Sequence, residues 1–369
     1  MRIGIDMSSL SDDKTGVGYY AVNLVKAIGK ADSSNMYFLY IREKYFQCFS
    51  DLGSNFTRKI IPDSRRYNLP KTQISLAYSI WKDKLDLFYS PAFFIPFICL
   101  CRSVITIHDL THVVFPEKHR KKHLFVFNSL LPYSIKRSSR IVADSMNTKK
   151  DIIRVFKVPE EKIRVVYAAA GDSFRPIKDE KAIARIKQKY GISSDYILFV
   201  GTIEPRKNII SLIQAYSLLK KNKPVDYKLV IVGKKGWMYS EVFNTVKELN
   251  LSEEIIFTYY TPEEDMVGLY NGAKVFVYPS LYEGFGLPPL EAMACGVPVI
   301  TSNVSSLPEV VGDAAIMVNP ADINQLAESI SRVINDEELR RKMIERGLER
   351  ARMFSWGKTA KEIIECFKE

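Results

Sequence analysis

Residues 274–301 read KVFVYPSLYEGFGLPPLEAMACGVPVIT, which is an apolar run, a loop rich in glycine and proline, a helix start and a second apolar run. The two runs, 274–278 and 297–301, are short, rich in β-branched residues and apolar almost throughout. This composition is typical of strands that are buried on both faces. A strand, a helix and a second strand in succession predict one unit of a parallel α/β sheet.

The same alternation extends along the whole chain of 369 residues, a length that suits two domains. Helical patterns, such as those at 17–30, 212–221 and 336–352, separate eight further apolar runs. These runs are 2–6, 36–41, 85–89, 104–108, 140–143, 196–200, 228–232 and 255–258. Two such series flank the polar segment 171–178. The sequence therefore predicts an α/β protein with two doubly wound parallel sheets, in domains 1–172 and 173–354.

Positive charge is concentrated in the first half of the chain. The whole chain has 53 Lys and Arg against 42 Asp and Glu, a net charge of +11. Residues 1–175 hold 28 basic and 16 acidic residues (+12), whereas residues 176–369 hold 25 and 26 (−1). This asymmetry predicts an anionic partner for the first half: a membrane surface, a nucleic acid or a phosphorylated substrate. The alternative is a basic protein without such a partner.

Composition excludes several classes of protein. With 47% apolar and 26% charged residues, the chain is neither disordered nor a small disulfide scaffold. The five cysteines form no C-x-x-C pair, so we expect reduced thiols and no zinc site. No run of about 18 uncharged apolar residues occurs, and the N-terminus has no apolar signal region. We therefore expect no transmembrane helix, no signal peptide and a cytoplasmic location.

Two candidate groups in the first domain follow predicted strands, at the sheet edge where ligands bind in open parallel sheets. Gly16 and Gly18 lie between the first strand and its helix, where bare amides at a helix N-terminus favour an anion. A plain strand-to-helix turn is the alternative. His108 ends the run 104–108 and is suited to hydrogen bonding near neutral pH. Its alternative is a buried histidine whose ring is satisfied by the backbone.

Two cations follow the first strand of the second domain. The segment GTIEPRKN, 201–208, places Arg206 and Lys207 where we predict the next helix to begin. Cations are unfavourable at a helix N-terminus unless an anion such as phosphate lies there too. The alternative is an exposed charge pair.

The stretch 274–301 contains two carboxylates and two glycines that could bind a ligand. Glu283 and Glu291 can accept hydrogen bonds from hydroxyls, and Gly284 and Gly286 expose amides that suit an anion. A ligand with hydroxyls at both ends and phosphate between them, such as a nucleoside diphosphate sugar, fits this layout. An acidic helix cap is the alternative.

The segment EGFGLPPLE, 283–291, resembles the E-x7-E motif of retaining glycosyltransferases of family 4, which have the GT-B fold. The resemblance spans essentially the whole chain and also rests on GVGYYAVNL at 16–24, HDL at 108–110, VGTIEPRKN at 200–208 and the extended stretch 282–315. It implies two Rossmann-like domains facing each other across a deep cleft. It further implies a C-terminal helix, 355–369, that crosses back to the first domain.

The resemblance also implies roles for individual residues. Arg206 and Lys207 would hold the donor diphosphate, Glu291 the ribose, and Glu283 with the following amides the donor sugar. The turn at 259–261 would meet the base, although it lacks the glycine often found there. The residues expected to bind the donor are Gly16, Gly18, Arg206, Lys207, Tyr260, Glu283, Gly284, Phe285, Gly286, Leu287 and Glu291. Those expected to act in catalysis are His108, Glu283, Arg206 and Lys207, with no metal and no cofactor.

The implied reaction is transfer of a hexose with retention onto a hydroxyl of a glycan or lipid-linked glycan, in surface polysaccharide or lipopolysaccharide synthesis. GDP-mannose is the preferred donor, because the segments around Arg206 and Glu283 look most like mannosyltransferases. A UDP-sugar, either UDP-glucose or UDP-N-acetylglucosamine, is the alternative. An epimerase or phosphorylase on the same fold, an inactive scaffold, and a non-enzymatic nucleotide-sugar-binding or nucleic-acid-binding protein are rivals. The chain has no nucleic-acid recognition signature.

The basic first domain suggests a peripheral enzyme at the inner face of the cell membrane. The basic segments 65–66, 118–122 and 149–150 are candidates for contact with anionic lipid headgroups. The apolar segment 93–100 has two interpretations, a surface that enters the membrane interface or a core strand or helix, and the second is preferred.

Overall fold

The computed structural model describes residues 1–10, 16–62, 69–116, 121–222 and 226–369, without the side chains of 69–72, 121–123 and 222. The predicted basic segment 65–66 lies outside these residues. So do residues 118–120 and the side chains at 121 and 122.

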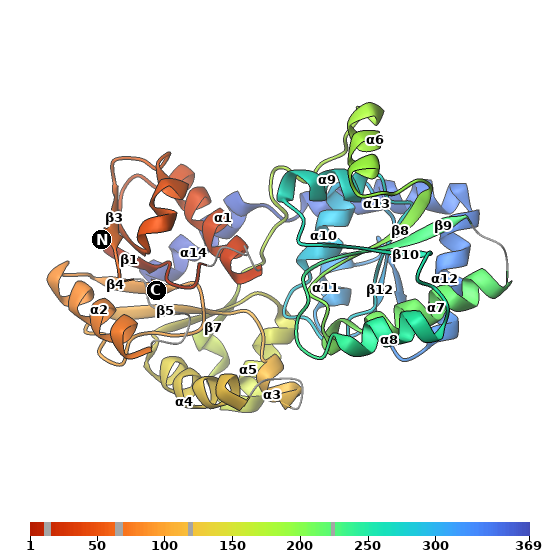
Figure 1. Cartoon of the computed structure of the whole chain (residues 1–369). Coiled ribbons are helices and arrows are strands. Elements are labelled where there is room, and N and C mark those ends of the chain that lie inside the picture. Colours follow the sequence, from red (N-terminus) through yellow and green to blue (C-terminus); the bar gives the residue numbers. More distant parts are fainter. Residues whose placement is uncertain (11–15, 63–68, 117–120, 223–225) are drawn as a thin grey trace. The chain divides into compact units, whose positions relative to one another are not determined.

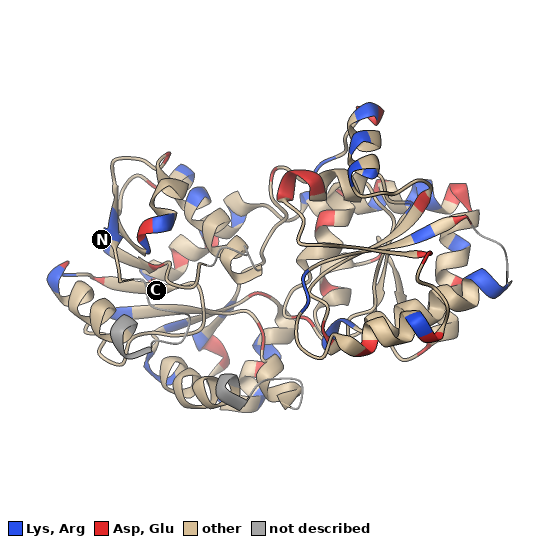
Figure 2. Cartoon of the chain, in the orientation of Figure 1, with Lys and Arg blue, Asp and Glu red and all other residues tan. Residues whose placement is uncertain are grey.

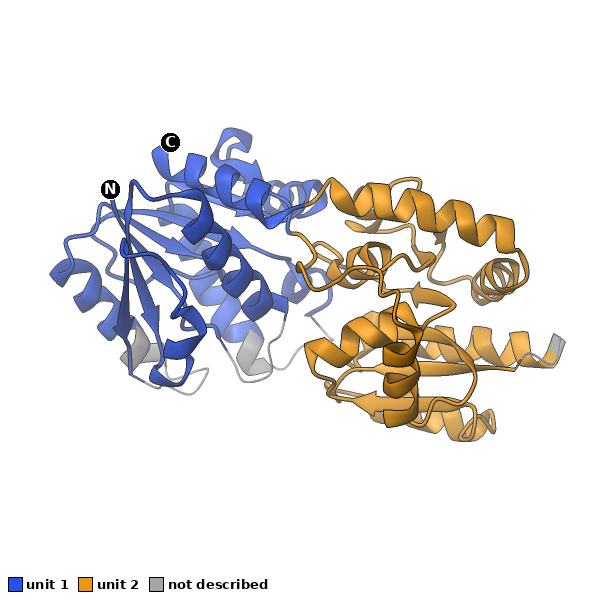
Figure 3. Ribbon diagram, turned by 90° about the horizontal axis from the view of Figure 1, so that it is seen from above, with its two compact units in different colours: residues 1–168, 355–369 blue, residues 169–354 orange. Residues whose placement is uncertain are grey.

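The chain divides into two compact units (Figure 3). Unit 1 comprises Met1–Ala168 and Ser355–Glu369, and unit 2 comprises Ala169–Phe354. The sequence predicts the boundary between the first and second domains between residues 172 and 173, whereas the contacts within the structure place it between residues 168 and 169.

Unit 1 is built on a seven-stranded sheet in which every pair of neighbours is parallel, in the order β3-β2-β1-β4-β5-β6-β7. Its strands are β1 (Arg2–Asp6), β2 (Met36–Ile41), β3 (Phe56–Ile60), β4 (Leu87–Ser90), β5 (Arg102–Ile107), β6 (Arg140–Ala143) and β7 (Ile163–Val165). Its α-helices are α1 (Gly16–Ala31), α2 (Leu69–Lys82), α3 (Thr111–Val114), α4 (Lys121–Arg137), α5 (Met146–Phe156) and α14 (Trp356–Lys368). Figure 1 shows α1 and α14 over one face of the sheet, and α2, α4 and α5 over the other. This follows from right-handed crossovers, because the strand order reverses at β1.

The C-terminal helix α14 packs against α1 and against β4, the central strand of the sheet in unit 1. The Trp356 ring lies 5.6 Å from that of Tyr20, and Phe367 lies 5.3 Å from Tyr89. The Thr359 hydroxyl donates to the backbone oxygen of Tyr167 at 2.7 Å. The last fifteen residues are therefore part of unit 1, although the whole of unit 2 precedes them in the chain.

Unit 2 contains a six-stranded parallel sheet with the order β10-β9-β8-β11-β12-β13. Its strands are β8 (Asp195–Val200), β9 (Tyr227–Val232), β10 (Ile255–Tyr259), β11 (Val275–Tyr278), β12 (Val299–Ser302) and β13 (Ile316–Val318). Its α-helices are α6 (Glu180–Lys189), α7 (Ile209–Asn222), α8 (Ser240–Glu248), α9 (Glu263–Asn271), α10 (Leu287–Ala294), α11 (Leu307–Val311), α12 (Ile323–Asn335) and α13 (Glu337–Arg352). Two parallel α/β sheets confirm the predicted fold class.

The apolar runs form the strands at the centre of each sheet, as predicted, because their side chains are buried on both faces. The sequence analysis missed β3, β7 and β13. These three strands lie at sheet edges. β3, with the sequence FTRKI, has no fully buried side chain, and β7 and β13 are three residues long with one buried side chain each, so none shows a long buried apolar run.

The preferred interpretation of segment 93–100 is wrong. The segment is neither a strand nor a helix but an irregular loop between β4 and β5. Pro96 has no amide hydrogen to continue a ladder or a helix, and Phe93 has a left-handed backbone with φ 65°. Ile95 and Cys99 are buried, whereas three other apolar side chains of this loop are exposed.

Candidate active site

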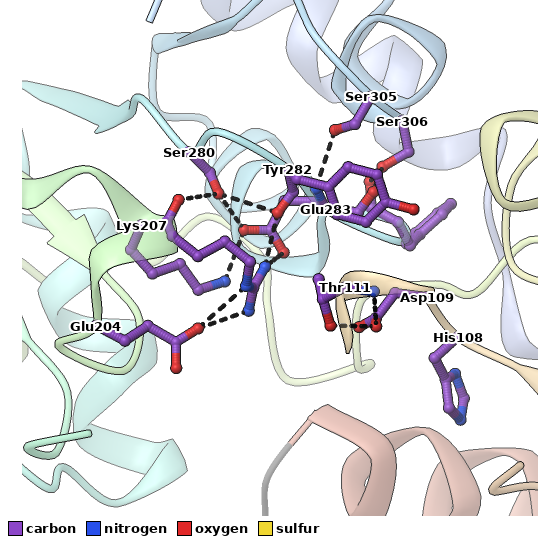
Figure 4. A network of polar contacts seen from close by, with 12 residues as sticks. His108, Asp109, Thr111, Glu204, Lys207, Ser280, Tyr282, Glu283, Ser305 and Ser306 are labelled. Atoms are coloured by element: carbon purple, nitrogen blue, oxygen red, sulfur yellow. Dashed lines mark hydrogen bonds and ion pairs between the residues drawn. The ribbon is translucent and has the colours of Figure 1, made fainter. Parts of the chain in front are cut away.

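Glu283, in the loop between β11 and α10, lies at the centre of a buried network of polar groups (Figure 4). Its Oε1 atom accepts hydrogen bonds from Lys207 Nζ at 2.7 Å, Tyr278 Oη at 2.9 Å and Ser280 Oγ at 2.5 Å. Its Oε2 atom pairs with Arg206 Nη1 at 2.8 Å. Both cations that the sequence analysis singled out therefore meet this one carboxylate.

A second carboxylate, Glu204, completes the network. Its Oε1 atom pairs with Arg206 Nη2 at 2.8 Å, so the guanidinium bridges Glu204 and Glu283. Arg206 Nη1 also donates to the backbone oxygen of Tyr282 at 2.7 Å. Two buried carboxylates therefore balance the buried Lys207 and the partly buried Arg206, which is the condition under which such charges are stable away from water.

The charges of this network shift the pKa values of its members. Burial alone would raise the pKa of Glu283, but Arg206 and Lys207 lower it to about 2. Burial and the neighbouring Arg206 lower the pKa of Lys207. Glu283 is therefore ionised at neutral pH and cannot act there as a proton donor.

Arg206 and Lys207 do not open α7, as the sequence analysis predicted. They lie in a 3-10 turn, Pro205–Lys207, that precedes it. Asn208 separates this turn from the helix in a left-handed conformation, φ 56°, which Asn tolerates better than most residues. Its side-chain amide donates to the backbone oxygens of Pro279 and Pro320 at 3.1 and 2.8 Å. The proximity of the cations to the Glu283 loop thus comes from this turn and not from a helix N-terminus.

The loop from Glu283 to Gly286 is held by two serines from the segment before α11. Ser305 Oγ accepts from the Glu283 amide at 2.9 Å, and Ser306 Oγ donates to the backbone oxygens of Glu283 and Phe285 at 3.0 and 2.6 Å. Gly286 has φ 119°, and a Cβ atom there would lie 3.0 Å from Leu307. Only glycine suits this position.

The neighbouring residues of the loop differ in burial. Gly284 is buried, and the Phe285 side chain is buried 5.8 Å from the Phe354 ring. Phe285 thus has only its backbone to offer a ligand. Leu287 is partly exposed and begins α10.

Glu291 lies in the second turn of α10, because the helix begins at Leu287. Its Oε2 atom accepts a hydrogen bond from the Tyr270 hydroxyl at 2.9 Å. Part of the residue is exposed, but the carboxyl group is withdrawn from water, and this burial raises its pKa to about 7. The Glu283 carboxyl group is therefore ionised at neutral pH, whereas the Glu291 carboxyl group titrates near neutral pH.

An aromatic surface follows β10. Tyr259 and Tyr260 are 44% and 60% exposed, and Tyr259 has φ 56° at the turn that lacks the expected glycine. A bulky residue in this conformation is uncommon and costs energy. Lys235 Nζ lies 5.3 Å from the centre of the Tyr259 ring. This turn thus presents flat rings beside a cation.

His108 follows β5 in unit 1 and has both ring nitrogens occupied. Nδ1 lies 2.5 Å from Asp144 Oδ2, and Nε2 lies 2.8 Å from the backbone oxygen of Pro91. The carbonyl only accepts, so Nε2 carries a proton. Burial pushes the pKa of His108 down, but Asp144 reverses this, and the net shift is upward. The ring is accordingly more readily protonated than a free histidine.

Gly16 and Gly18 lie in the first turn of α1. Neither has a positive φ, and a Cβ atom at Gly16 would meet nothing within 4 Å. The fold of unit 1 by itself therefore does not require glycine at position 16.

Comparison with known proteins identifies the family. Residues 182–350 match the model "Glycosyl transferases group 1", and residues 15–169 match "Glycosyltransferase Family 4". The chain is 33% identical over 96% of its length to O-antigen chain mannosyltransferase B of Escherichia coli, of which it also covers 96%. The chain belongs to glycosyltransferase family 4.

Two further proteins are similar to this family 4 chain. O-antigen chain mannosyltransferase RfbU of Salmonella typhimurium is 34% identical over 64% of the chain and 65% of that protein. The solved structure of HepE from Anabaena, in complex with UDP and glucose, superposes with a TM-score of 0.80 at 18% identity, covering 100% of this chain and 99% of that one. The similarity to HepE supports the GT-B fold.

Several residues that shape the candidate site of this glycosyltransferase were not predicted from the sequence. Glu204 and Tyr278 contact the two cations, and Ser280 contacts Glu283. Ser305 and Ser306 hold the loop. Glu204 stands two residues before Arg206, a spacing that could have indicated a local ion pair. No local pattern points to the serines, because 22 residues separate Ser305 from Glu283.

Proposed function

We propose that this glycosyltransferase moves mannose from GDP-mannose, with retention at the anomeric carbon, onto a hydroxyl of a glycan or lipid-linked glycan. The observation that carries the proposal is the buried network of Glu283, Arg206 and Lys207. It combines a permanent carboxylate, suited to sugar hydroxyls, with two cations suited to a diphosphate. The likeness to O-antigen mannosyltransferases supports mannose and a role in surface polysaccharide or lipopolysaccharide synthesis.

In this proposal Arg206 and Lys207 stabilise the negative charge that develops on the leaving diphosphate. Glu283 orients the sugar and is not a nucleophile: when the diphosphate takes Arg206 and Lys207, the carboxylate stays bound to Tyr278 and Ser280 and accepts hydrogen bonds from sugar hydroxyls. The acceptor hydroxyl attacks from the face that the diphosphate leaves, and its proton passes to the departing phosphate. No metal or cofactor takes part.

The remaining donor contacts come from unit 2. Glu291 accepts hydrogen bonds from the ribose hydroxyls, and the Tyr260 ring stacks on the base. The sugar lies against the backbone from Gly284 to Leu287. Gly16 and Gly18 of unit 1 keep their predicted place near the diphosphate. We place His108 at the reacting face of the sugar, where its Nε2 atom would exchange the Pro91 oxygen for a sugar hydroxyl.

The donor is tested by thermal-shift measurements with GDP, UDP, ADP and their sugar conjugates, with EDTA present. A ligand at about 100 times its Kd stabilises by about 2.7 kcal/mol, which raises Tm by several degrees. We expect this rise with GDP and GDP-mannose alone. A rise with UDP compounds instead would replace the donor by the UDP-sugar alternative, and no rise with any nucleotide would contradict the proposal.

GDP-mannose affinity is expected to increase about tenfold from pH 6 to pH 8, because ribose hydroxyls donate to the ionised form of Glu291, whose pKa is about 7. Isothermal titration measures this dependence, and the Glu291→Gln variant should bind weakly at both pH values. Tyr270 donates to Glu291, so Tyr270→Phe should move the midpoint to higher pH. If affinity in the Glu291→Gln variant kept the same dependence on pH, Glu291 would not be the titrating group and would not belong to the donor site.

The proposed location is peripheral, at the inner face of the cell membrane, where a lipid-linked acceptor is available. No helix in the described part of the chain is long and apolar enough to cross a membrane.

A further inference from the structure

The helix α2 of unit 1 has apolar side chains on two sides. Leu76 and Ile80 are buried against the sheet, as expected for a covering helix. On the outer side, Ile74, Tyr78 and Trp81 are 69%, 56% and 64% exposed, at the i, i+4, i+7 spacing of a single helix face. The outer side of a covering helix is ordinarily polar, so this stripe requires an explanation.

The loop between β4 and β5 extends this stripe. Phe97, Ile98 and Leu100 are 53%, 62% and 72% exposed. The Phe97 amide donates to the side chain of Gln73 on α2 at 2.8 Å, which attaches the loop beside Ile74. We call Ile74, Tyr78, Trp81, Phe97, Ile98 and Leu100 together the α2 face.

The helix α4 supports this loop from its other side. The Tyr133 hydroxyl donates to the backbone oxygen of Phe97 at 2.5 Å, and the two rings lie 5.3 Å apart. The exposed loop is therefore fixed to α2 by one hydrogen bond and to α4 by another.

Charges around the α2 face are predominantly positive. The described side chains of residues 73–101 and 124–137 include four basic and two acidic residues, and Figure 2 shows no acidic residue on the described parts of α2 and α4. The two acids are engaged: Asp83 is buried and pairs with Lys59 at 3.0 Å, and Asp86 accepts from the Arg2 amide at 2.7 Å. Lys82, whose Nζ lies 5.8 Å from the Tyr78 ring, stands at one end of the face.

We propose that unit 1 binds the surface of anionic lipid bilayers through the α2 face, with Trp81, Ile98 and Leu100 entering the headgroup boundary. An apolar stripe with amphipathic aromatic rings and a basic rim is the combination that such interfaces bind. The charge of unit 1 is complementary to them, because its 30 basic and 18 acidic residues give +12, against −1 for unit 2. The inference deepens the proposed function by giving the enzyme a surface that meets lipid-linked acceptors.

The first test is sedimentation of the full chain with vesicles of phosphatidylcholine containing phosphatidylglycerol, or of phosphatidylcholine alone. We expect binding to the anionic vesicles, weakening as salt is raised. Ile98→Ser should lower the partition coefficient about fivefold, and Ile98→Ser/Leu100→Ser more than tenfold.

The matched control is Ile60→Ser. Ile60 is 58% exposed on β3 of the same unit. Its neighbours Lys59 and Ile61 point toward α2, since Lys59 pairs with Asp83 and Ile61 belongs to the core under α2. Because side chains alternate along a strand, Ile60 points to the other face of the sheet. This variant should bind vesicles like the unchanged protein, and every variant should keep its Tm.

Trp81 supplies a second readout. The chain has three tryptophans: Trp81 is exposed, Trp356 is buried, and Trp237 is partly buried in unit 2. Only Trp81 lies on the α2 face, so anionic vesicles should shift its emission to shorter wavelength and brominated lipids should quench it. Trp81→Phe should bind nearly as well and lose both signals.

Failure to bind anionic vesicles, or equal binding by Ile98→Ser/Leu100→Ser and Ile60→Ser, would overturn the inference. So would a dimer in sedimentation velocity that only Ile98→Ser/Leu100→Ser abolishes, because the α2 face would then join two copies. Vesicle binding needs neither donor nor transfer. A protein that binds vesicles but no nucleotide would sustain this inference and contradict the proposed function.

Discussion

Replacement of Lys207 by methionine is expected to lower kcat for sugar transfer by about 10²–10³, with a smaller change in donor Kd. Lys207 is buried, and its Nζ atom lies 2.7 Å from Glu283 and 2.6 Å from the Tyr278 hydroxyl. In the proposed reaction, charge on the diphosphate increases as its bond to the sugar breaks. A fixed cation is therefore more strongly engaged in the transition state than in the bound donor.

The measurement is steady-state transfer from GDP-mannose together with equilibrium binding of the donor. Lys220→Met is the matched control, because Lys220 also lies in unit 2 and pairs with a carboxylate, that of Glu254 at 3.0 Å. It should keep full activity. Equal losses in donor affinity and in kcat/KM, with kcat unchanged, would show that Lys207 only binds the donor and would contradict its role at the leaving group.

The central strands could be predicted because burial on both faces leaves a continuous apolar run in the sequence. The pattern identified the strand at 196–200 directly. The edge strand β3 contains three polar residues and β13 is only three residues long, so no long apolar run marks them, whereas the edge strand β10 does carry one. The prediction of a core strand or helix at 93–100 was wrong for the opposite reason, because a surface loop made of apolar residues looks like a core segment in the sequence.

The site was predictable as a set of residues but not as a network. Glu283, Arg206 and Lys207 were identified as separate candidates, two as ligands of a phosphate and one as a ligand of hydroxyls. Their direct pairing depends on Asn208, which has a left-handed backbone. The Asn208 side chain contacts Pro279 and Pro320, which are 71 and 112 residues away in the chain. Such long-range contacts leave no local spacing in a single sequence. The structure thus adds that both cations are paired with Glu283, so in the proposed function a diphosphate has to compete with this carboxylate for them.

Replacement of Glu283 by glutamine is expected to abolish measurable transfer and to lower the free energy of unfolding by about 3 kcal/mol or more. The carboxylate pairs with Lys207 and, together with that of Glu204, with Arg206. Its loss leaves a net positive charge buried in a network that is otherwise balanced. Urea denaturation at pH 7 measures this change.

Glu254→Gln is the matched control for this loss of stability. Glu254 also pairs with two cations, Lys220 at 3.0 Å and Lys228 at 3.3 Å, but these groups are partly exposed. Surface pairs of this kind contribute little, so its free energy of unfolding should fall by less than about 1 kcal/mol. Equal changes in the two variants would mean that the Glu283 network is open to water.

GDP should partly restore the stability of Glu283→Gln, and this separates a charge effect from loss of packing. In the unchanged protein, the diphosphate has to displace Glu283 from Arg206 and Lys207, whereas in the variant these cations have no such competitor. GDP, which has no sugar to contact position 283, should therefore raise Tm more in Glu283→Gln than in the unchanged chain, although transfer is lost. A smaller rise in the variant would mean that the carboxylate does not compete with the nucleotide, and that the two cations are not its diphosphate site.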